Sequence, residues 1–125
     1  MEAQLIGNAI VTPDGAELPL HIWPSDADPE AVVLALHGFN DYGTFIKDAA
    51  IYFGKRGVKV YSYDQRGFGQ SPHRGFWPGT SALGQDLAAA TKLLRNHHPG
   101  IPFYLLGHSM GGAVTLSTLK SVNPP

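Results

Sequence analysis

Gly107-His108-Ser109-Met110-Gly111-Gly112 is the stretch that decides the fold, because a strand-like run precedes it and a helix-like run follows it. The first run is apolar and covers residues 102–106, and the second covers residues 113–122. We predict a strand that leads into the stretch and a helix that begins near Met110, which leaves Ser109 on a sharp turn. A Gly-x-Ser-x-Gly pattern between a strand and a helix is typical of a nucleophile elbow.

The two glycines that flank the serine have a steric reason. A side chain at Gly107 or Gly111 would crowd the neighbouring strand or helix while the serine backbone is held in a sparsely populated conformation. The turn raises the Ser109 hydroxyl above the sheet. The amide of Met110 then lies at a helix N-terminus, where unpaired N–H groups favour a negatively charged oxygen. The alternative is a glycine-rich turn that contains a serine by chance, and the flanking strand and helix favour the elbow.

Composition sets the limits for the whole chain. A length of 125 residues implies one domain at most, and a net charge of -1 gives no electrostatic reason to expect nucleic acid or an anionic membrane. The count of 0 cysteines excludes disulfides, thiol catalysis and thiolate metal sites. No apolar run approaches the roughly 20 residues of a membrane span, and the N-terminus lacks the pattern of a signal peptide. We therefore expect a cytoplasmic protein, and no metal or organic cofactor is indicated.

The remaining chain predicts a hairpin followed by alternating strands and helices. Pro-Asp-Gly within residues 12–15 predicts the turn of a hairpin between Leu5–Val11 and Glu17–Trp23. Residues 31–36 have no polar alternation, which fits a parallel strand covered on both faces. Further strands are predicted at Val58–Tyr63 and Phe103–Leu106, with helices at Tyr42–Arg56 and from a cap at Thr80 or Ser81 to about His97. This order predicts an α/β fold with a largely parallel sheet.

Apolar spacing predicts which side of each helix is buried. In the first helix the predicted buried residues are Phe45, Ala49, Tyr52 and Phe53. In the second they are Leu83, Leu87, Ala90, Leu93 and Leu94.

Two loops follow parallel strands at the edge where this fold places its chemistry. A tetrahedral intermediate needs a second N–H donor beside that of Met110, and in His37-Gly38-Phe39-Asn40-Asp41 we choose Phe39. The alternative is an ordinary strand-to-helix turn. The loop that begins Asp64-Gln65-Arg66-Gly67-Phe68-Gly69-Gln70-Ser71 is similar to a dinucleotide fingerprint only superficially, because Pro72 and a long loop follow. We interpret it as a structural loop that Asp64 and Arg66 hold in place.

Together and in this order, the three stretches at 37–39, 64–71 and 107–112 resemble the α/β-hydrolase superfamily, most closely its monoacylglycerol lipase and lysophospholipase branch. The resemblance extends from Val11 to Leu116. It implies that Ser109 is the nucleophile and that the amides of Met110 and Phe39 form the oxyanion hole. It also implies a small-molecule substrate of the lipid-ester type and a cap region, with peripheral membrane contact through that cap left open.

The sequence departs from this family in one respect. Family members place the acid and the histidine of the triad after the nucleophile, whereas no Asp, Glu or His follows Ser109. None of the six histidines is expected to replace them: two are expected to be packed in turns, two lie at the far end of a helix, and two have no identified partner. In that order they are His37 and His108, His97 and His98, and His21 and His73.

We therefore expect residues 1–125 to be a single partial α/β-hydrolase domain, the N-terminal portion of a longer protein. The run at 103–106 has the apolar character of an interior strand, yet nothing after it could pair with its open side. The cap and the C-terminal strands would be absent, the sheet would be incomplete after the elbow strand, and Asn123-Pro124-Pro125 would begin a connection. The oligomeric state is left open.

The sequence thus predicts a serine ester hydrolase whose fragment alone turns over substrate negligibly. The alternative is a non-catalytic α/β-hydrolase-like module that binds a ligand or a partner. Esters, peptides, peroxides and thioesters all stay open as substrates. Five aromatic residues could line an acyl pocket, although core or loop packing is the simpler explanation for any one of them: Phe39, Tyr42, Phe68, Phe76 and Trp77.

Overall fold

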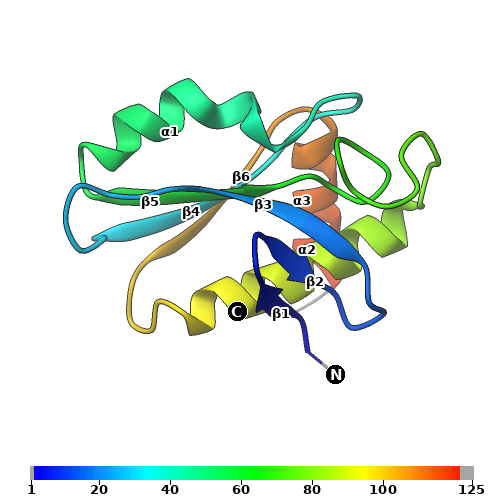
Figure 1. Ribbon diagram of the computed structural model, residues 1–125, viewed down its shortest axis with the longest axis horizontal. Coiled ribbons are helices and arrows are strands. Elements are labelled where there is room, and N and C mark those ends of the chain that lie inside the picture. The colour runs from blue at the N-terminus through cyan, green and yellow to red at the C-terminus, as the bar shows by residue number, and fades with distance from the viewer. Residues whose placement is uncertain (1, 122–125) are drawn as a thin grey trace.

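The computed structural model describes residues 2–121, with nothing assigned to the side chain of residue 121. Six strands form one sheet in the order β1-β2-β3-β5-β4-β6 (Figure 1). Strands β4, β5 and β6 run parallel, and the pairs β1/β2, β2/β3 and β3/β5 are antiparallel. The bounds are Gln4–Ile6 for β1, Ala9–Val11 for β2, Glu17–Trp23 for β3, Ala31–Leu36 for β4, Val58–Tyr63 for β5 and Phe103–Gly107 for β6.

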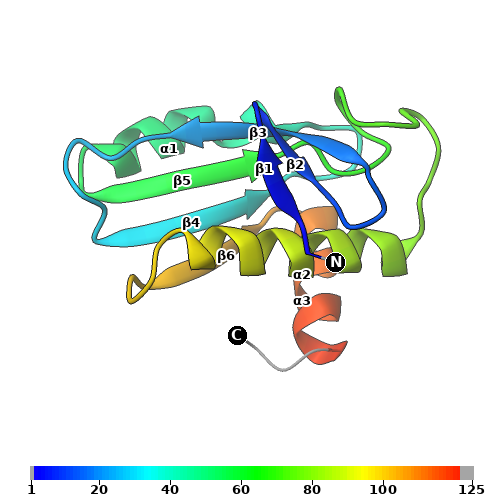
Figure 2. The same cartoon turned by 60° about the horizontal axis from the view of Figure 1, so that its bottom comes forward.

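Helices cover both faces of the sheet. A 3-10 turn, η1 (Gly43–Ile46), continues into α1 (Lys47–Gly54) on one face, while α2 (Thr80–Asn96) and α3 (Met110–Ser121) lie on the other (Figures 1 and 2). Successive residues of β4 point to opposite faces, so Val33 packs in the core under α1 and Leu34 in the core under α2 and α3. The predicted α/β fold with a largely parallel sheet is confirmed.

Three local predictions are wrong. Residues 5–11 are not one strand, because Gly7 turns the chain with a φ of 58° and splits the segment into β1 and β2. Ala49 and Tyr52 were expected to be buried, but both are exposed. The buried residues of this segment are Ile46 and Ala50, one turn apart. The N-cap of α2 is Gly79, with no side-chain cap hydrogen bond. Turn chemistry and the tilt of a helix against its sheet decide such details, and apolar spacing alone does not.

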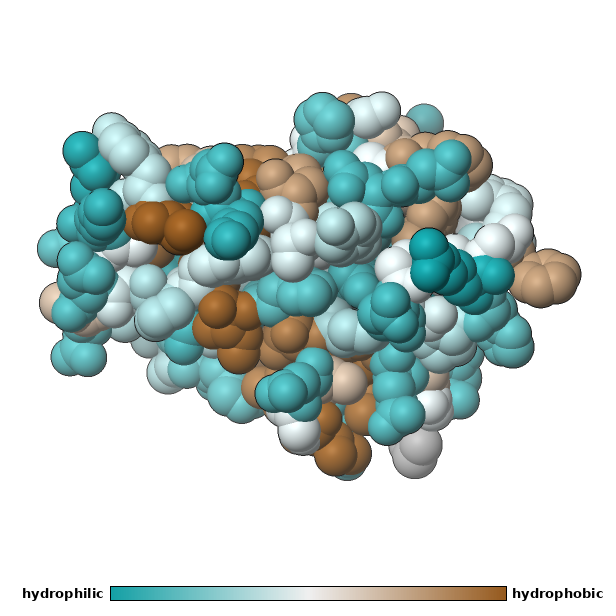
Figure 3. Space-filling view, turned by 45° about the horizontal axis from the view of Figure 1, so that its top comes forward, coloured by the Kyte–Doolittle hydropathy of each residue, from teal (hydrophilic) through white to brown (hydrophobic). Residues whose placement is uncertain are grey.

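Strand β6 is at the edge of the described sheet, where β4 is its only partner among residues 2–121. The predicted start of a connection at 123–125 lies outside the described residues. On the side that carries α1, hydrophobic side chains form separate patches among hydrophilic ones (Figure 3). Within residues 2–121, every helix is too short or too polar to cross a membrane.

Candidate active site

The carboxyl ends of β4, β5 and β6 point to the same edge of the sheet, and the loops that follow them gather there (Figure 1). The loop after β4 lies directly against the turn between β6 and α3, because a Cβ added at Gly38 would be 3.4 Å from the Cβ of Ser109. The His108 amide also donates to the carbonyl of Leu36, the last residue of β4, at 3.0 Å. The fold therefore brings the first and third predicted motifs into contact.

Ser109 occupies the sharp turn between β6 and α3. Its φ is 55°, in the left-handed region that L-residues rarely adopt, and its side chain is exposed. A Cβ at Gly107 would be 2.5 Å from the Cα of Gly112, and one at Gly111 would be 2.3 Å from the carbonyl oxygen of Leu36. The predicted steric reason for the two glycines is confirmed, since both positions face backbone that a side chain would have to displace.

Met110 is the first residue of α3. The next amide, that of Gly111, donates to the His108 carbonyl at 2.9 Å, and the Ala113 amide donates to the Ser109 carbonyl at 3.1 Å. An N–H in the first turn of a helix has no acceptor within that helix, which applies to the Met110 amide. Its role as an oxyanion donor stays a prediction.

Phe39 follows Gly38 in the loop that contacts the elbow. Its side chain is 62% exposed, so it contributes nothing to the core. Asn40, which comes next, has a φ of 60° and turns the chain away from the strand direction. The convergence of the Phe39 and Met110 amides on one oxygen stays a prediction.

His37 is fully buried and holds the first and second motifs together. Its Nε2 accepts the Gln65 amide at 2.9 Å, so its Nδ1 carries the proton and donates to the Gly38 carbonyl at 2.8 Å. The Gln65 side chain also donates to the His37 carbonyl at 2.8 Å. Burial lowers the pKa of His37, in agreement with this neutral form. With both ring nitrogens in use, His37 is a packed residue, as predicted, and not a free base.

Asp64 is a buried acceptor at the start of the loop after β5. Its carboxylate accepts the Gly43 amide at 2.7 Å, the Gln70 amide at 3.0 Å and the ring of His21 at 2.9 Å. Burial alone would raise the pKa of Asp64, but the hydrogen bonds from His21 and the two amides outweigh it and lower the pKa. Sequence reasoning found no partner for His21, because 43 residues separate it from Asp64 and no local pattern links them.

Arg66 joins this loop to two distant segments. Its guanidinium contacts the buried carboxylate of Asp86 on α2 at 2.9 Å and the exposed carboxylate of Asp14 at 2.7 Å. The hydrogen bond from Arg66 lowers the pKa of Asp14, while burial raises that of Asp86 despite the same cation. The structural role predicted for Asp64 and Arg66 is confirmed. Asp64 and Arg66 act through separate partners. The contact of Arg66 with Asp86 is not predicted by the sequence.

The contacts given for His97, His98 and His108 are with residues other than Ser109. His97 and His98 are at the C-terminal end of α2, where His97 bonds the Leu93 carbonyl and His98 bonds the Tyr61 hydroxyl at 2.7 Å. His108 is exposed, with its ring 6.1 Å from that of Phe45, so the prediction that His108 is packed is wrong.

Within residues 2–121 no three His, Asp or Glu side chains are grouped as metal ligands would be.

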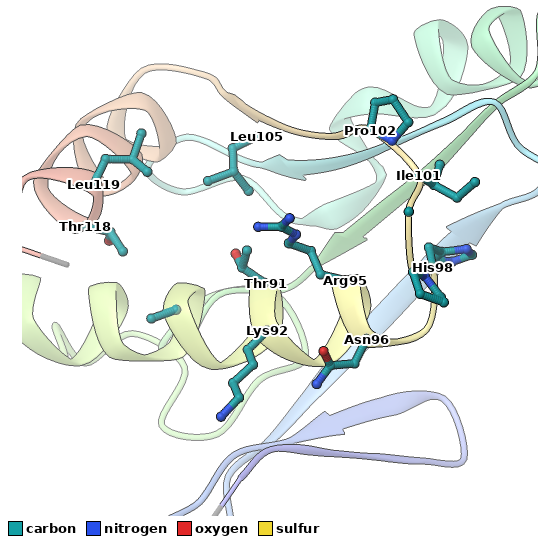
Figure 4. Close-up of a pocket in the computed structure, with 13 residues that line it drawn as sticks. Thr91, Lys92, Arg95, Asn96, His98, Ile101, Pro102, Leu105, Thr118 and Leu119 are labelled. Carbon is teal, nitrogen blue, oxygen red and sulfur yellow. The ribbon is translucent and has the colours of Figure 1, made fainter. Parts of the chain in front are cut away.

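Two cavities differ in their relation to this edge. A cavity of about 270 Å³ lies between the loops after β4 and β5, and all five predicted aromatic residues line it: Phe39, Tyr42, Phe68, Phe76 and Trp77. A larger cavity of about 910 Å³ lies beside β6, between the end of α2 and α3, with the Arg95 side chain extending toward Leu105 (Figure 4). The larger one adjoins the unpaired edge of β6 and contains none of the predicted site residues, so the smaller one belongs to the candidate site.

Known proteins match most of this chain. The family model described as "Serine aminopeptidase, S33" matches residues 27–125. The chain is 33% identical over 104 residues to a monoacylglycerol lipase of Mycolicibacterium smegmatis, and 28% identical over 110 residues to the human monoglyceride lipase. These alignments cover 82% and 87% of this chain but only 37% and 36% of the two relatives.

A solved structure shares the fold. A soluble variant of the monoglyceride lipase of Saccharomyces cerevisiae, in complex with a substrate analogue, superposes with a TM-score of 0.72 at 24% identity. The superposition covers 98% of this chain and 40% of that one. The predicted similarity to the monoacylglycerol lipase branch is confirmed, and the chain spans well under half the length of these relatives.

Proposed function

Because the chain belongs to the serine aminopeptidase S33 family of α/β-hydrolases, we propose that it supplies the nucleophile and the oxyanion donors of a serine hydrolase that cleaves carboxylic esters. The observation that carries the proposal is the backbone of Ser109, whose φ of 55° presents an exposed hydroxyl at the carboxyl edge of the sheet. A strained residue persists only where its surroundings enforce it, and strain of this kind clusters at functional sites.

The proposed chemistry assigns one step to each residue. The Ser109 hydroxyl oxygen attacks the ester carbonyl carbon, and its proton passes to a histidine base. The carbonyl oxygen becomes negatively charged, and the amides of Met110 and Phe39 donate to it. As this intermediate collapses, the histidine gives the proton to the leaving oxygen, the alcohol departs and an acyl group stays on Ser109. Water then attacks the acyl carbon, which releases the acid and restores the Ser109 hydroxyl.

The acid and the histidine of the triad are the missing parts of this proposal. His37 is excluded as the base because both of its ring nitrogens are already bonded. The relatives are longer than the span that this chain matches, and we assign both groups to that additional length. It follows that the 125-residue chain alone should hydrolyse esters negligibly.

We propose lipid-type esters as the substrates because both relatives are named as lipases of monoacylglycerols.

A second candidate function is a non-catalytic binding module. The aromatic-lined cavity of about 270 Å³ favours that alternative, because such a hollow can hold a ligand without any reaction. The two candidates differ in whether the Ser109 hydroxyl reacts when a base is provided.

Chemical rescue tests the proposal on the chain as it is. Hydrolysis of 4-nitrophenyl butyrate would be followed with increasing imidazole, which supplies a diffusible base, for the natural chain and for Ser109→Ala. A positioned base contributes about 10²–10⁴-fold, so we expect imidazole to raise the Ser109-dependent rate by roughly 10-fold. Ser81→Ala, at an exposed serine on α2, is the matched control and should behave as the natural chain.

Each result has a definite meaning. A rescued rate that Ser109→Ala lacks supports the hydrolase, and labelling of Ser109 by a fluorophosphonate should follow the same pattern. A rate in imidazole that is equal in both proteins would favour the binding module. Efficient hydrolysis without imidazole would contradict the assignment of the base to a segment outside this chain.

A further inference from the structure

Five aromatic residues line the cavity of about 270 Å³, and all of them except Phe68 are exposed. Phe39 is 62% exposed, Phe76 75% and Trp77 56%, although each is large and apolar. Single exposed hydrophobic residues need no explanation, but several that surround one hollow are typical of a binding site. We call this hollow the aromatic cavity, after the five aromatic residues in its lining: Phe39, Tyr42, Phe68, Phe76 and Trp77.

The rings of the aromatic cavity are arranged around Phe39. The Phe39 ring meets Phe68 edge to face, with centroids 5.5 Å apart and planes at 76°, and it lies 6.5 Å from Trp77 at 50°. These separations are those of favourable aromatic pairs, which present both faces and edges to a neighbour. A further flat ring can join such a group with the same geometry, whereas an alkyl chain gains no directional contact from it.

The wall contributed by the loop after β5 is fixed by its backbone. Gly67 donates to the Pro72 carbonyl at 3.1 Å and accepts from the Gly75 amide at 3.0 Å. A Cβ at Gly67 would be 2.5 Å from the Phe76 carbonyl oxygen, so the two ends of this wall are in close contact. The cavity is therefore a formed feature of the loop.

Size limits what the cavity can hold. A dry cavity of about 150 Å³ in another protein takes one benzene molecule. At about 270 Å³ the aromatic cavity has room for one ring with a short substituent, and too little for a long acyl chain. The polar side chains in its lining, Asp41 and Arg74 among them, are available to orient such a substituent.

We propose that the aromatic cavity is a subsite for an aryl group carried by the ester substrate on one side of the reacting carbonyl. This inference rests on the proposed function for its place in catalysis, since Phe39 both lines the cavity and supplies the proposed oxyanion amide. Phe39, which lines the cavity, directly follows Gly38, and Gly38 lies against Ser109, so one loop joins the cavity wall to the elbow. The substrate class is then a lipid-type ester that also carries a compact aryl group, with its longer chain extending outside this cavity.

Tryptophan fluorescence tests the subsite without any need for activity. The chain contains 2 tryptophans, Trp77 in the cavity and Trp23 on β3, so Trp23→Phe leaves Trp77 as the reporter and Trp77→Phe is the matched control. Benzyl alcohol is titrated as the aryl probe, with cyclohexanol and 1-hexanol as aliphatic probes of similar size.

We expect benzyl alcohol to give a saturable change in the emission of Trp23→Phe and none in Trp77→Phe. The aliphatic alcohols should bind at least about 3-fold more weakly, because they cannot form the directional contacts of an aromatic pair. Phe76→Ala removes one wall and should weaken benzyl alcohol binding by a similar factor, with an unchanged circular dichroism spectrum.

Two results would overturn the inference. Equal affinity for benzyl alcohol and 1-hexanol would show an apolar hollow with no preference for rings, and a linear response would show no site. Ser109→Ala should bind benzyl alcohol as the natural chain does. Failure of the imidazole rescue together with intact aryl binding would therefore reject the proposed hydrolase and keep the cavity as a site that binds aryl groups.

Discussion

The loop edge beside Ser109 and the open side beside β6 are built in different ways. At the loop edge, buried polar groups such as His37 and Asp64 fix the backbone by hydrogen bonds, and no side chain fits at Gly111. On the open side β6 has one strand partner among residues 2–121, and large apolar side chains are exposed, Tyr104 at 59% and Leu116 at 71%. Within residues 2–121, the contacts that fix the elbow from outside come from Leu36, His37 and Gly38, which precede it in the chain, and the comparison teaches that these contacts can be tested apart from the open side.

The largest loss of stability is expected from a methyl group added at Gly111. Gly111→Ala would place a Cβ 2.3 Å from the Leu36 carbonyl oxygen and 2.7 Å from that of His37, so α3 must move away from β4. Overpacking of this kind costs about 1–3 kcal/mol, and we expect the upper end because the neighbours are backbone. Urea unfolding followed by circular dichroism measures the loss.

Gly112→Ala is the matched control for this substitution. The added Cβ would be 3.4 Å from the nearest atom, the carbonyl oxygen of Gly107, which is an ordinary contact. Alanine is favoured over glycine inside a helix by about 1 kcal/mol, so this variant should be equal to the natural chain or more stable. Similar losses for the two variants would mean that the elbow does not rest on β4.

The sequence was sufficient for the parts of the site that are local. Ser109 and its two glycines lie within five residues, and short-range sterics dictate their geometry. The partners of the supporting groups are distant: Arg66 meets Asp86 across 20 residues, and His21 meets Asp64 across 43. Such pairs depend on how whole elements pack, which no local pattern encodes.

The same limit explains the errors in the fold. The order of strands and helices follows from apolar runs, and it was predicted correctly. The turn at Gly7 and the buried side of α1 were not, because a short apolar segment suits one strand or two, and α1 turns Ala50 toward the sheet where Ala49 was expected. The aromatic cavity was indicated by its residues, yet only the fold could show that all five rings share one hollow.

A smaller effect should come from Asp64→Asn, and it depends on pH. Hydrogen bonds keep the pKa of Asp64 below its ordinary value of 3.8, although burial opposes them. A carboxyl with a lowered pKa contributes stability that is complete above its unfolded pKa and is lost as pH falls through the folded one. We expect Asp64→Asn to lose about 1–2 kcal/mol at pH 7, since its amide nitrogen cannot accept the Gln70 amide.

Urea unfolding of this variant at pH 7 and at pH 3 measures the change. The difference in unfolding free energy between the natural chain and Asp64→Asn should shrink toward acid, because the carboxyl of the unfolded chain takes up a proton at a higher pH than the folded one does. Asp28→Asn, at an exposed loop carboxylate, should match the natural chain at both values. A difference that is constant with pH would mean that the Asp64 charge contributes nothing to the loop edge.

The smallest effect is expected on the open side, from Leu116→Gln on α3. Leu116 is 71% exposed, so the substitution removes little buried apolar surface, and we expect a change within about 0.5 kcal/mol. Val114, two residues earlier on the same helix, is 3% exposed and packs in the core, so Val114→Ala should cost roughly 2 kcal/mol. Urea unfolding of both variants gives the two losses of unfolding free energy to compare.

A loss of more than about 1 kcal/mol for Leu116→Gln would mean that something covers this face in solution. The covering layer would then be a second copy of the chain, and the loss would grow with protein concentration, since dissociation precedes unfolding in that case.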